Sequence, residues 1–172
     1  MQRRVISLIL SLSILHAGIA KAQSRSQQIE RQCRDVIREV RAEIWQRHSV
    51  AVVEVFQRQL NASNYTYLPV NQNGGVLRRR YTLALYNDAN SRATQRSVNF
   101  LSSPATMRTY SQKIHDRCHP VAMVSFGLYQ TSFGVELGVD RAGRMFIFKC
   151  IGYGFGDPRN PNPVPWGRTI CE

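Results

Sequence analysis

The first 22 residues have the three parts of a secretory signal peptide, and this feature constrains how the rest of the chain can fold. Arg3 and Arg4 give a positive start, residues 5–15 form a short apolar run, and Ala20-Lys21-Ala22 places small residues where signal peptidase cuts. Residues 5–20 are fewer than the ~20 that a membrane-spanning helix needs. We therefore expect cleavage after Ala22 and a secreted or periplasmic protein. An uncleaved membrane anchor is the alternative.

An oxidising compartment decides how the cysteines are used, so Cys33, Cys118, Cys150 and Cys171 are predicted to form disulfides. Three pairings are possible. The strands expected below place Cys118 and Cys150 at opposite ends of a sheet, roughly 25–30 Å apart, whereas a disulfide holds its Cα atoms within ~7 Å. Cys118–Cys150 is therefore the least favoured bond. Of the two remaining patterns we predict Cys33–Cys118, which would tie the first helix to the sheet, and Cys150–Cys171, which would close a proline-rich tail that has little secondary structure of its own.

After cleavage, residues 23–172 are expected to form a single secreted domain. Removing Arg3, Arg4 and Lys21 from the net charge of +12 leaves +9. Arginine supplies nearly all of the positive charge, because only Lys113 and Lys149 remain as lysines. Such a charge favours anionic partners, for example acidic polysaccharides, phosphate polymers or lipid headgroups. A basic protein that is merely soluble is the alternative.

Residues 24–46 are predicted to form a long helix with one apolar stripe. Its apolar residues recur at helical spacing: Ile29, Cys33, Val36, Ile37, Val40 and Ile44. The charged residues between them are of both signs: Arg31, Arg34, Arg38 and Arg41 alternate with Glu30, Asp35, Glu39 and Glu43. This mixture predicts a solvated face with ion pairs four residues apart, and not a stripe that binds nucleic acid.

The middle of the chain contains mixed signals. β-branched residues favour a strand at 50–56, although a helix is an alternative there. Residues 65–70 and 76–86 flank the turn sequence 71–75 and predict a hairpin. Residues 87–103 are polar and predict a loop, with a short strand at 98–101. Ser103-Pro104 then predicts the start of a helix that leads to Cys118.

The C-terminal third predicts a three-stranded meander, with strands at 121–129, 133–139 and 145–151. A tight turn at Asp140–Gly143 joins the last two strands. Residues 152–167 are rich in glycine and proline and predict an extended tail. The expected fold is α+β, with a long N-terminal helix packed on a mainly antiparallel sheet, a C-terminal three-stranded meander and a disulfide-tied Pro-rich tail.

The candidate anion-binding residues are Arg78, Arg79 and Arg80, the densest positive segment of the chain. The alternative is that these charges protect an edge strand from aggregation. His48, His115 and His119 are candidates for the acid–base groups of a small ribonuclease-like phosphodiester hydrolase, which needs two imidazoles and a cation around a phosphate.

No metal or cofactor is expected. The cluster of His115, Cys118 and His119 has no second pair of ligands to complete a zinc site. A serine-hydrolase elbow is absent from the sequence, and residues 152–156 lack the glycine spacing of a nucleotide-binding loop.

Cys118, residues 124–127, residues 148–150 and Pro165-Trp166-Gly167 with Cys171 resemble a group of small secreted cyanobacterial proteins of unknown function. The resemblance covers the last third of the chain and the signal segment. It implies an exported protein and a style of fold, and it transfers no catalytic residue.

The sequence therefore predicts a non-enzymatic binding or accessory protein of the cell envelope, whose basic surface engages an anionic partner such as a polysaccharide. The alternatives are the phosphodiester hydrolase and an inhibitor of a secreted enzyme that presents the proline-rich tail. No specific nucleic acid is expected as a partner, and the oligomeric state is left open.

Overall fold

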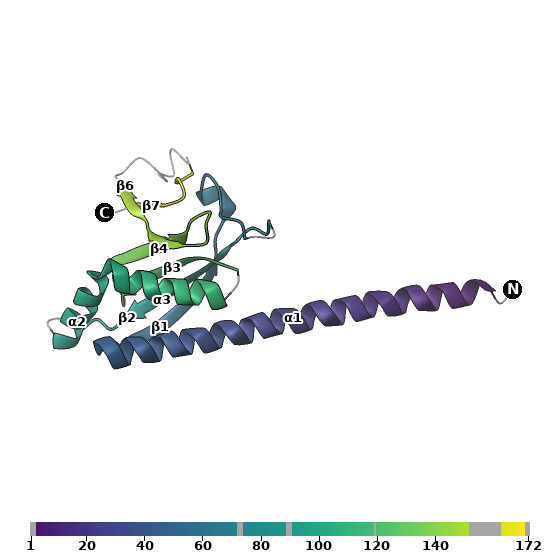
Figure 1. Cartoon of the computed structure of the whole chain (residues 1–172), viewed down its shortest axis with the longest axis horizontal. Coiled ribbons are helices and arrows are strands. Elements are labelled where there is room, and N and C mark those ends of the chain that lie inside the picture. Colours follow the sequence, from purple (N-terminus) through teal and green to yellow (C-terminus); the bar gives the residue numbers. More distant parts are fainter. Residues whose placement is uncertain (1–2, 72–73, 89–90, 119, 152–162, 171–172) are drawn as a thin grey trace.

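The computed structural model describes residues 3–71, 74–88, 91–118, 120–151 and 163–170, with side chains described from residue 26 onward. These residues form three helices and seven strands, together with one 3-10 turn (Figure 1). In chain order they are α1 (Arg3–His48), β1 (Val52–Gln59), the 3-10 turn Ala62–Asn64, β2 (Arg79–Leu85), α2 (Arg92–Leu101), α3 (Pro104–Arg117), β3 (Val121–Leu128), β4 (Gly134–Val139), β5 (Met145–Ile147), β6 (Lys149–Ile151) and β7 (Arg168–Ile170).

The main sheet has five strands in the order β1-β2-β3-β4-β5. Every neighbouring pair is antiparallel except β2 and β3, which are parallel. A parallel pair needs a long crossover connection, and here α2 and α3 provide it. The helices lie on one side of the sheet, and the small parallel sheet of β6 and β7 lies on the other (Figure 1). The predicted α+β fold with a mainly antiparallel sheet is confirmed, and so is the meander of β3, β4 and β5.

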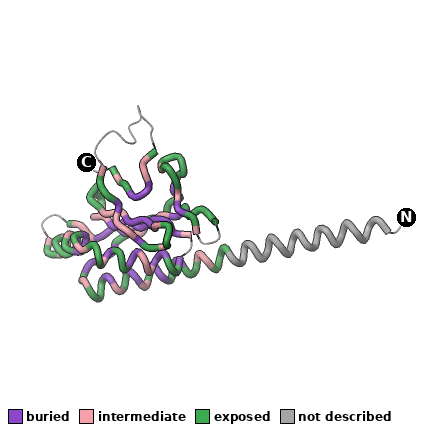
Figure 2. Tube along the Cα trace, turned by 45° about the horizontal axis from the view of Figure 1, so that its top comes forward, coloured by how far each residue is buried: buried purple, intermediate pink, exposed green. Residues whose placement is uncertain are grey.

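Helix α1 packs on the sheet through the predicted apolar stripe. Cys33, Val36, Val40 and Ile44 are at most 1 % exposed, and Ile29 is half-buried. Figure 2 shows the alternation of buried and exposed residues along this segment. The helix is longer than the predicted range, because it also includes the residues of the predicted signal segment. Among the described residues, no helix is long and apolar enough to cross a bilayer.

Burial within the described part of α1 begins at Ile29. A chain that begins at Gln23 is therefore expected to keep the thermal unfolding midpoint of the full chain within experimental error, as measured by circular dichroism of both proteins. A midpoint lower by several degrees would mean that residues 1–22 contribute to the fold, contrary to the interpretation of this segment as a signal.

The loop predicted at 87–103 is wrong, because most of it forms α2. Ser91 caps this helix by accepting a hydrogen bond from the Thr94 amide at 3.1 Å. Only Ser97, Phe100 and Leu101 are buried, so a short amphipathic face near one end is enough to hold the helix on the core. Because the first turns of α2 are polar, the sequence pattern does not indicate this buried face.

The hairpin predicted around residues 71–75 is also largely wrong. Strand β2 pairs with β1 and β3, while the preceding segment contributes isolated bridges, between Val70 and Val76 and between Tyr65 and Val164. Pro69 has no amide hydrogen to donate to a ladder, although its carbonyl accepts a hydrogen bond from Leu77 at 2.8 Å. The ladder of β2 is therefore completed by strands that are more distant in the sequence.

The last strand of the predicted meander is divided in two. β5 belongs to the main sheet, whereas β6 pairs with β7. Between them Phe148 is buried against Trp166, whose indole donates a hydrogen bond to the Val139 carbonyl at 3.0 Å. A Cβ atom at Gly138 would lie only 2.2 Å from the Phe148 ring, so glycine is required where these rings cover the second face of the sheet.

Candidate functional site

Three of the acidic residues of α1 are neutralised by other elements, and not by the arginines of α1 itself. Glu30 pairs with Arg79 of β2 at 2.5 Å. Glu39 and Glu43 pair with Lys113 of α3 at 2.7 and 2.5 Å, and Glu39 also pairs with Arg117. The ion pairs predicted between residues four apart in α1 are therefore wrong in the described residues. The one ion pair within the helix joins Arg38 and Asp35, three residues apart.

The hydrogen bonds at Glu39 determine its charge. The side chains of Lys113 and Arg117 donate to this carboxylate and hold its pKa below the usual range. The hydrogen bonds from Glu39 and Glu43 also raise the pKa of Lys113. Glu39 and Lys113 are consequently both charged at neutral pH. Glu39 and Glu43 therefore stay paired with α3.

This arrangement leaves a row of exposed cations on α1, which we call the arginine stripe: Arg31, Arg34, Arg38 and Arg41. Spacings of three and four residues place the four side chains on one side of the helix, over about 15 Å. In the described residues, no carboxylate pairs with Arg31, Arg34 or Arg41. Trp45 continues the row and is 57 % exposed.

The arginine stripe lies next to the edge of the sheet. The Arg41 guanidinium donates a hydrogen bond of 2.9 Å to the carbonyl of Val52, the first residue of β1. In the part of the chain that the structure describes, the only carboxylate paired with the stripe is that of Asp35, at 2.8 Å from Arg38, and both side chains of this pair are largely exposed. An exposed pair of this kind contributes little energy and exchanges readily with another anion.

The predicted anion-binding triplet is dispersed by the structure. Arg79 is 8 % exposed and faces α1. Arg80 lies on the other side of β2 and pairs with Glu136 of β4 at 2.6 Å. Only Arg78 is exposed. The alternative role as protection of an edge strand is wrong, since β2 lies between β1 and β3 in the sheet.

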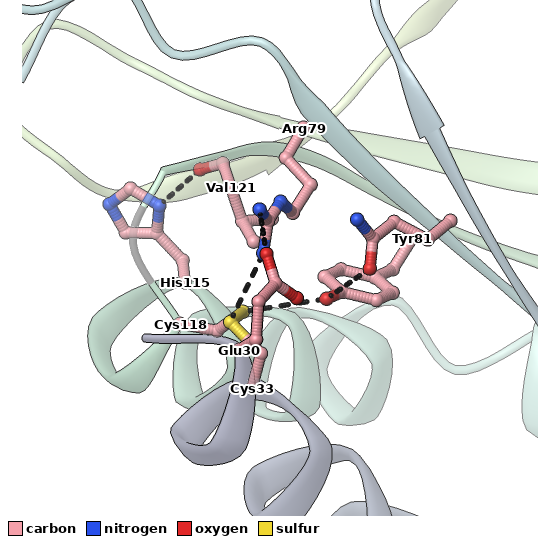
Figure 3. Close-up of a disulfide and its surroundings, with 8 residues drawn as sticks. Glu30, Cys33, Arg79, Tyr81, His115, Cys118 and Val121 are labelled. Carbon is pink, nitrogen blue, oxygen red and sulfur yellow. Dashed lines mark hydrogen bonds and ion pairs between the residues drawn. A yellow bond between two sulfur atoms is a disulfide. The ribbon is translucent and has the colours of Figure 1, made fainter. Parts of the chain in front are cut away.

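The predicted disulfide Cys33–Cys118 is confirmed, with a Cα–Cα distance of 4.7 Å. It joins α1 to the end of α3 and is completely buried. Figure 3 shows its polar surroundings: the Arg79 guanidinium donates to the Cys33 sulfur at 3.5 Å, and the Tyr81 hydroxyl lies 3.8 Å from the Cys118 sulfur. Burial raises the pKa of Tyr81.

The structure describes only one of the two cysteines of the second predicted disulfide. Cys150 of β6 is disulfide-bonded. Cys171 lies outside the described residues, so the pairing of these two cysteines stays a prediction. In the parallel pair of β6 and β7, Cys150 lies opposite Thr169, which precedes Cys171 by two residues in the sequence.

The candidate catalytic histidines have different surroundings. The His48 ring packs on Phe100 and Tyr110, and its Nε2 lies 3.2 Å from the Tyr110 hydroxyl. His115 is buried, and its Nδ1 lies 2.7 Å from the carbonyl of Val121, an acceptor that requires a proton on this nitrogen. His119 lies outside the described residues, so the hydrolase alternative stays a prediction.

A pocket of about 1030 Å³ lies between the start of the packed part of α1, the end of α3 and the β4–β5 turn. His115, Asp116 and Asp140 are among its lining residues, and His48 is not. Partial burial acts to raise the pKa of Asp140, but hydrogen bonds from the Arg144 and Ala142 amides outweigh this and lower it. Asp140 therefore serves as an acceptor that holds the turn together, which is a structural role.

Comparison of the chain with protein-family models, curated proteins and solved structures yields no match. The sequence pattern identified the residues of the arginine stripe but not which of them are left without a carboxylate partner. The cations that pair with the acids of α1 lie 49 to 78 residues further along the chain.

Proposed function

We propose that this chain is an exported, non-enzymatic binding protein of the cell envelope, and that the arginine stripe of α1 engages an anionic polymer. The observation that carries the proposal is the pairing of Glu30, Glu39 and Glu43 with cations of β2 and α3. These pairs remove the negative charges that would otherwise neutralise the stripe from within the helix.

The chemistry of the stripe suits a repeating anion. Guanidinium groups bind carboxylate, sulfate and phosphate oxygens in a bidentate manner and stay charged at every physiological pH. A row of them on a rigid helix presents cations at a fixed spacing, so a flexible polymer can bind them in succession. The expected export is supported by the pattern of the first 22 residues and by the use of cysteine in a buried disulfide.

The salt dependence of binding to fluorescent dextran sulfate tests the proposal. Replacing Arg31, Arg34 and Arg41 with glutamine removes three ionic contacts. It should make the negative slope of log affinity against log salt concentration less steep by about 3. The measurement is fluorescence anisotropy between about 0.05 and 0.3 M salt, a range over which screening changes strongly.

A matched control separates the stripe from the overall charge. The control variant replaces three exposed arginines of the other helices, Arg92, Arg96 and Arg108, with glutamine. It carries the same net charge as the stripe variant but keeps the stripe, so its slope should stay close to that of the unmodified protein. Equal losses in the two variants would show that affinity follows net charge alone, and the proposed role of α1 would then be wrong.

A further inference from the structure

Strand β1 is the open edge of the main sheet. Among the strands of the described residues its only neighbour is β2, and its residues from Glu54 to Gln59 are exposed apart from Val55, which is half-buried. Phe56 is 38 % exposed in the middle of this segment. An edge strand of this kind offers a row of backbone donors and acceptors to another strand.

The hydrogen-bond pattern identifies which backbone groups face outward. The Leu60 amide donates to the Arg78 carbonyl at 2.6 Å, just beyond the β1–β2 ladder. Because bonded and non-bonded pairs alternate in an antiparallel ladder, Phe56 and Arg58 direct their backbone groups toward β2. Val55 and Gln57 direct theirs toward the open edge.

The start of β1 is unavailable for strand pairing. Arg41 occupies the Val52 carbonyl, and the register shifts between Val52 and Glu54, which is the sign of a β-bulge. The usable edge is therefore Glu54–Gln59, and Phe56 lies close to its centre.

We propose that two copies of this chain associate through β1, antiparallel, about a two-fold axis that passes between their Phe56 residues. In this register Val55 of one copy lies opposite Gln57 of the other, and each such pair can exchange both backbone hydrogen bonds. Phe56 lies opposite Phe56 of the second copy, in a non-bonded pair whose side chains come closest. The exposed ring of each copy is thereby covered.

Charge supports this particular register. The same two-fold places Glu54 opposite Arg58 of the second copy, twice over, on the sheet face that also carries Phe56. In the described residues of one copy, neither side chain has an ion-pair partner. The strand is thus complementary to itself, as the interface of a symmetric dimer must be.

The contact is small, and the two-fold brings both arginine stripes to one side of the joined sheet, where they repel each other. A weak, reversible dimer is therefore expected, of the kind formed by interfaces below the standard size. Its dissociation constant should fall within about 1 µM to 1 mM.

Charge reversal tests both the dimer and its register, using sedimentation equilibrium at about 0.15 M salt. Glu54→Arg alone and Arg58→Glu alone each place like charges opposite one another, so each variant should remain monomeric where the unmodified chain dimerises. Mixed together, these two variants should form a heterodimer, because both facing pairs then become complementary. The double variant E54R/R58E should dimerise like the unmodified chain.

Both positions are exposed, and the circular dichroism of each variant confirms that it is folded. Arg96→Glu on α2 serves as the control for net charge and should leave the dimer unchanged. A monomer at every concentration of the unmodified chain overturns the proposal. Single variants that dimerise as strongly as the unmodified chain, or a mixture that does not associate, overturn the register on which it depends.

Discussion

Replacement of Cys33 and Cys118 by alanine is expected to lower the free energy of unfolding by about 4.5 kcal/mol. The two residues are separated by 85 positions, and a cross-link that closes a loop of this length restricts the unfolded chain by about that amount. Both cysteines are also buried in the core, so the alanines leave small cavities that add to the loss.

Urea unfolding of the oxidised protein and the double alanine variant measures this difference. The comparison should use the linear extrapolation from matched transitions, with the slope checked for a change in the unfolded state. A loss below about 1 kcal/mol would mean that non-covalent contacts of α1 restrict the unfolded chain about as much as the disulfide does. The disulfide would then add little by lowering the entropy of the unfolded chain.

The second large effect is expected at the pair of Glu30 and Arg79. Glu30→Gln should cost about 3 kcal/mol of unfolding free energy, because it leaves the buried Arg79 guanidinium without its counter-charge. The Arg79 side chain is 9 % exposed, whereas that of Glu30 is 35 % exposed. An arginine cannot release its proton to escape this cost.

Substitution of the partner residue, Arg79, is the control for this prediction. Arg79→Met removes the buried charge, keeps most of the aliphatic volume and leaves Glu30 in contact with water, so it should cost less than Glu30→Gln. Urea unfolding of both variants gives the order. If Arg79→Met were the more damaging change, the hydrogen bond from Arg79 to the Cys33 sulfur would outweigh the cost of an uncompensated charge.

The parts of the fold that could be predicted are those with a local pattern. The stripe from Cys33 to Ile44 repeats at helical spacing, and the alternation of apolar residues in 133–139 predicts the strand that β4 forms. Helix α2 was missed because its buried residues are confined to its second half. The break after Ile147 was missed because it depends on Trp166, which reaches this strand from the far end of the chain.

The candidate site was predictable only as a list of residues. Arg78, Arg79 and Arg80 form a dense cluster in the sequence, but successive residues of a strand point to opposite faces, which separates Arg79 from Arg80. The acids of α1 alternate with its arginines in the sequence, yet Lys113 and Arg79 neutralise them from other elements. Such assignments depend on which elements are neighbours, and a single sequence without relatives does not contain that information.

On the proposed export route, the order of the cysteines along the chain favours formation of the Cys33–Cys118 bond. These are the first and second cysteines from the N-terminus, so in a chain that crosses a membrane N-terminus first they meet the oxidising side before Cys150 arrives. Oxidation in order of arrival then yields the native pair directly. The chain would need no thiol–disulfide exchange to correct it, and α1 would already be attached to α3 when the last strands are delivered.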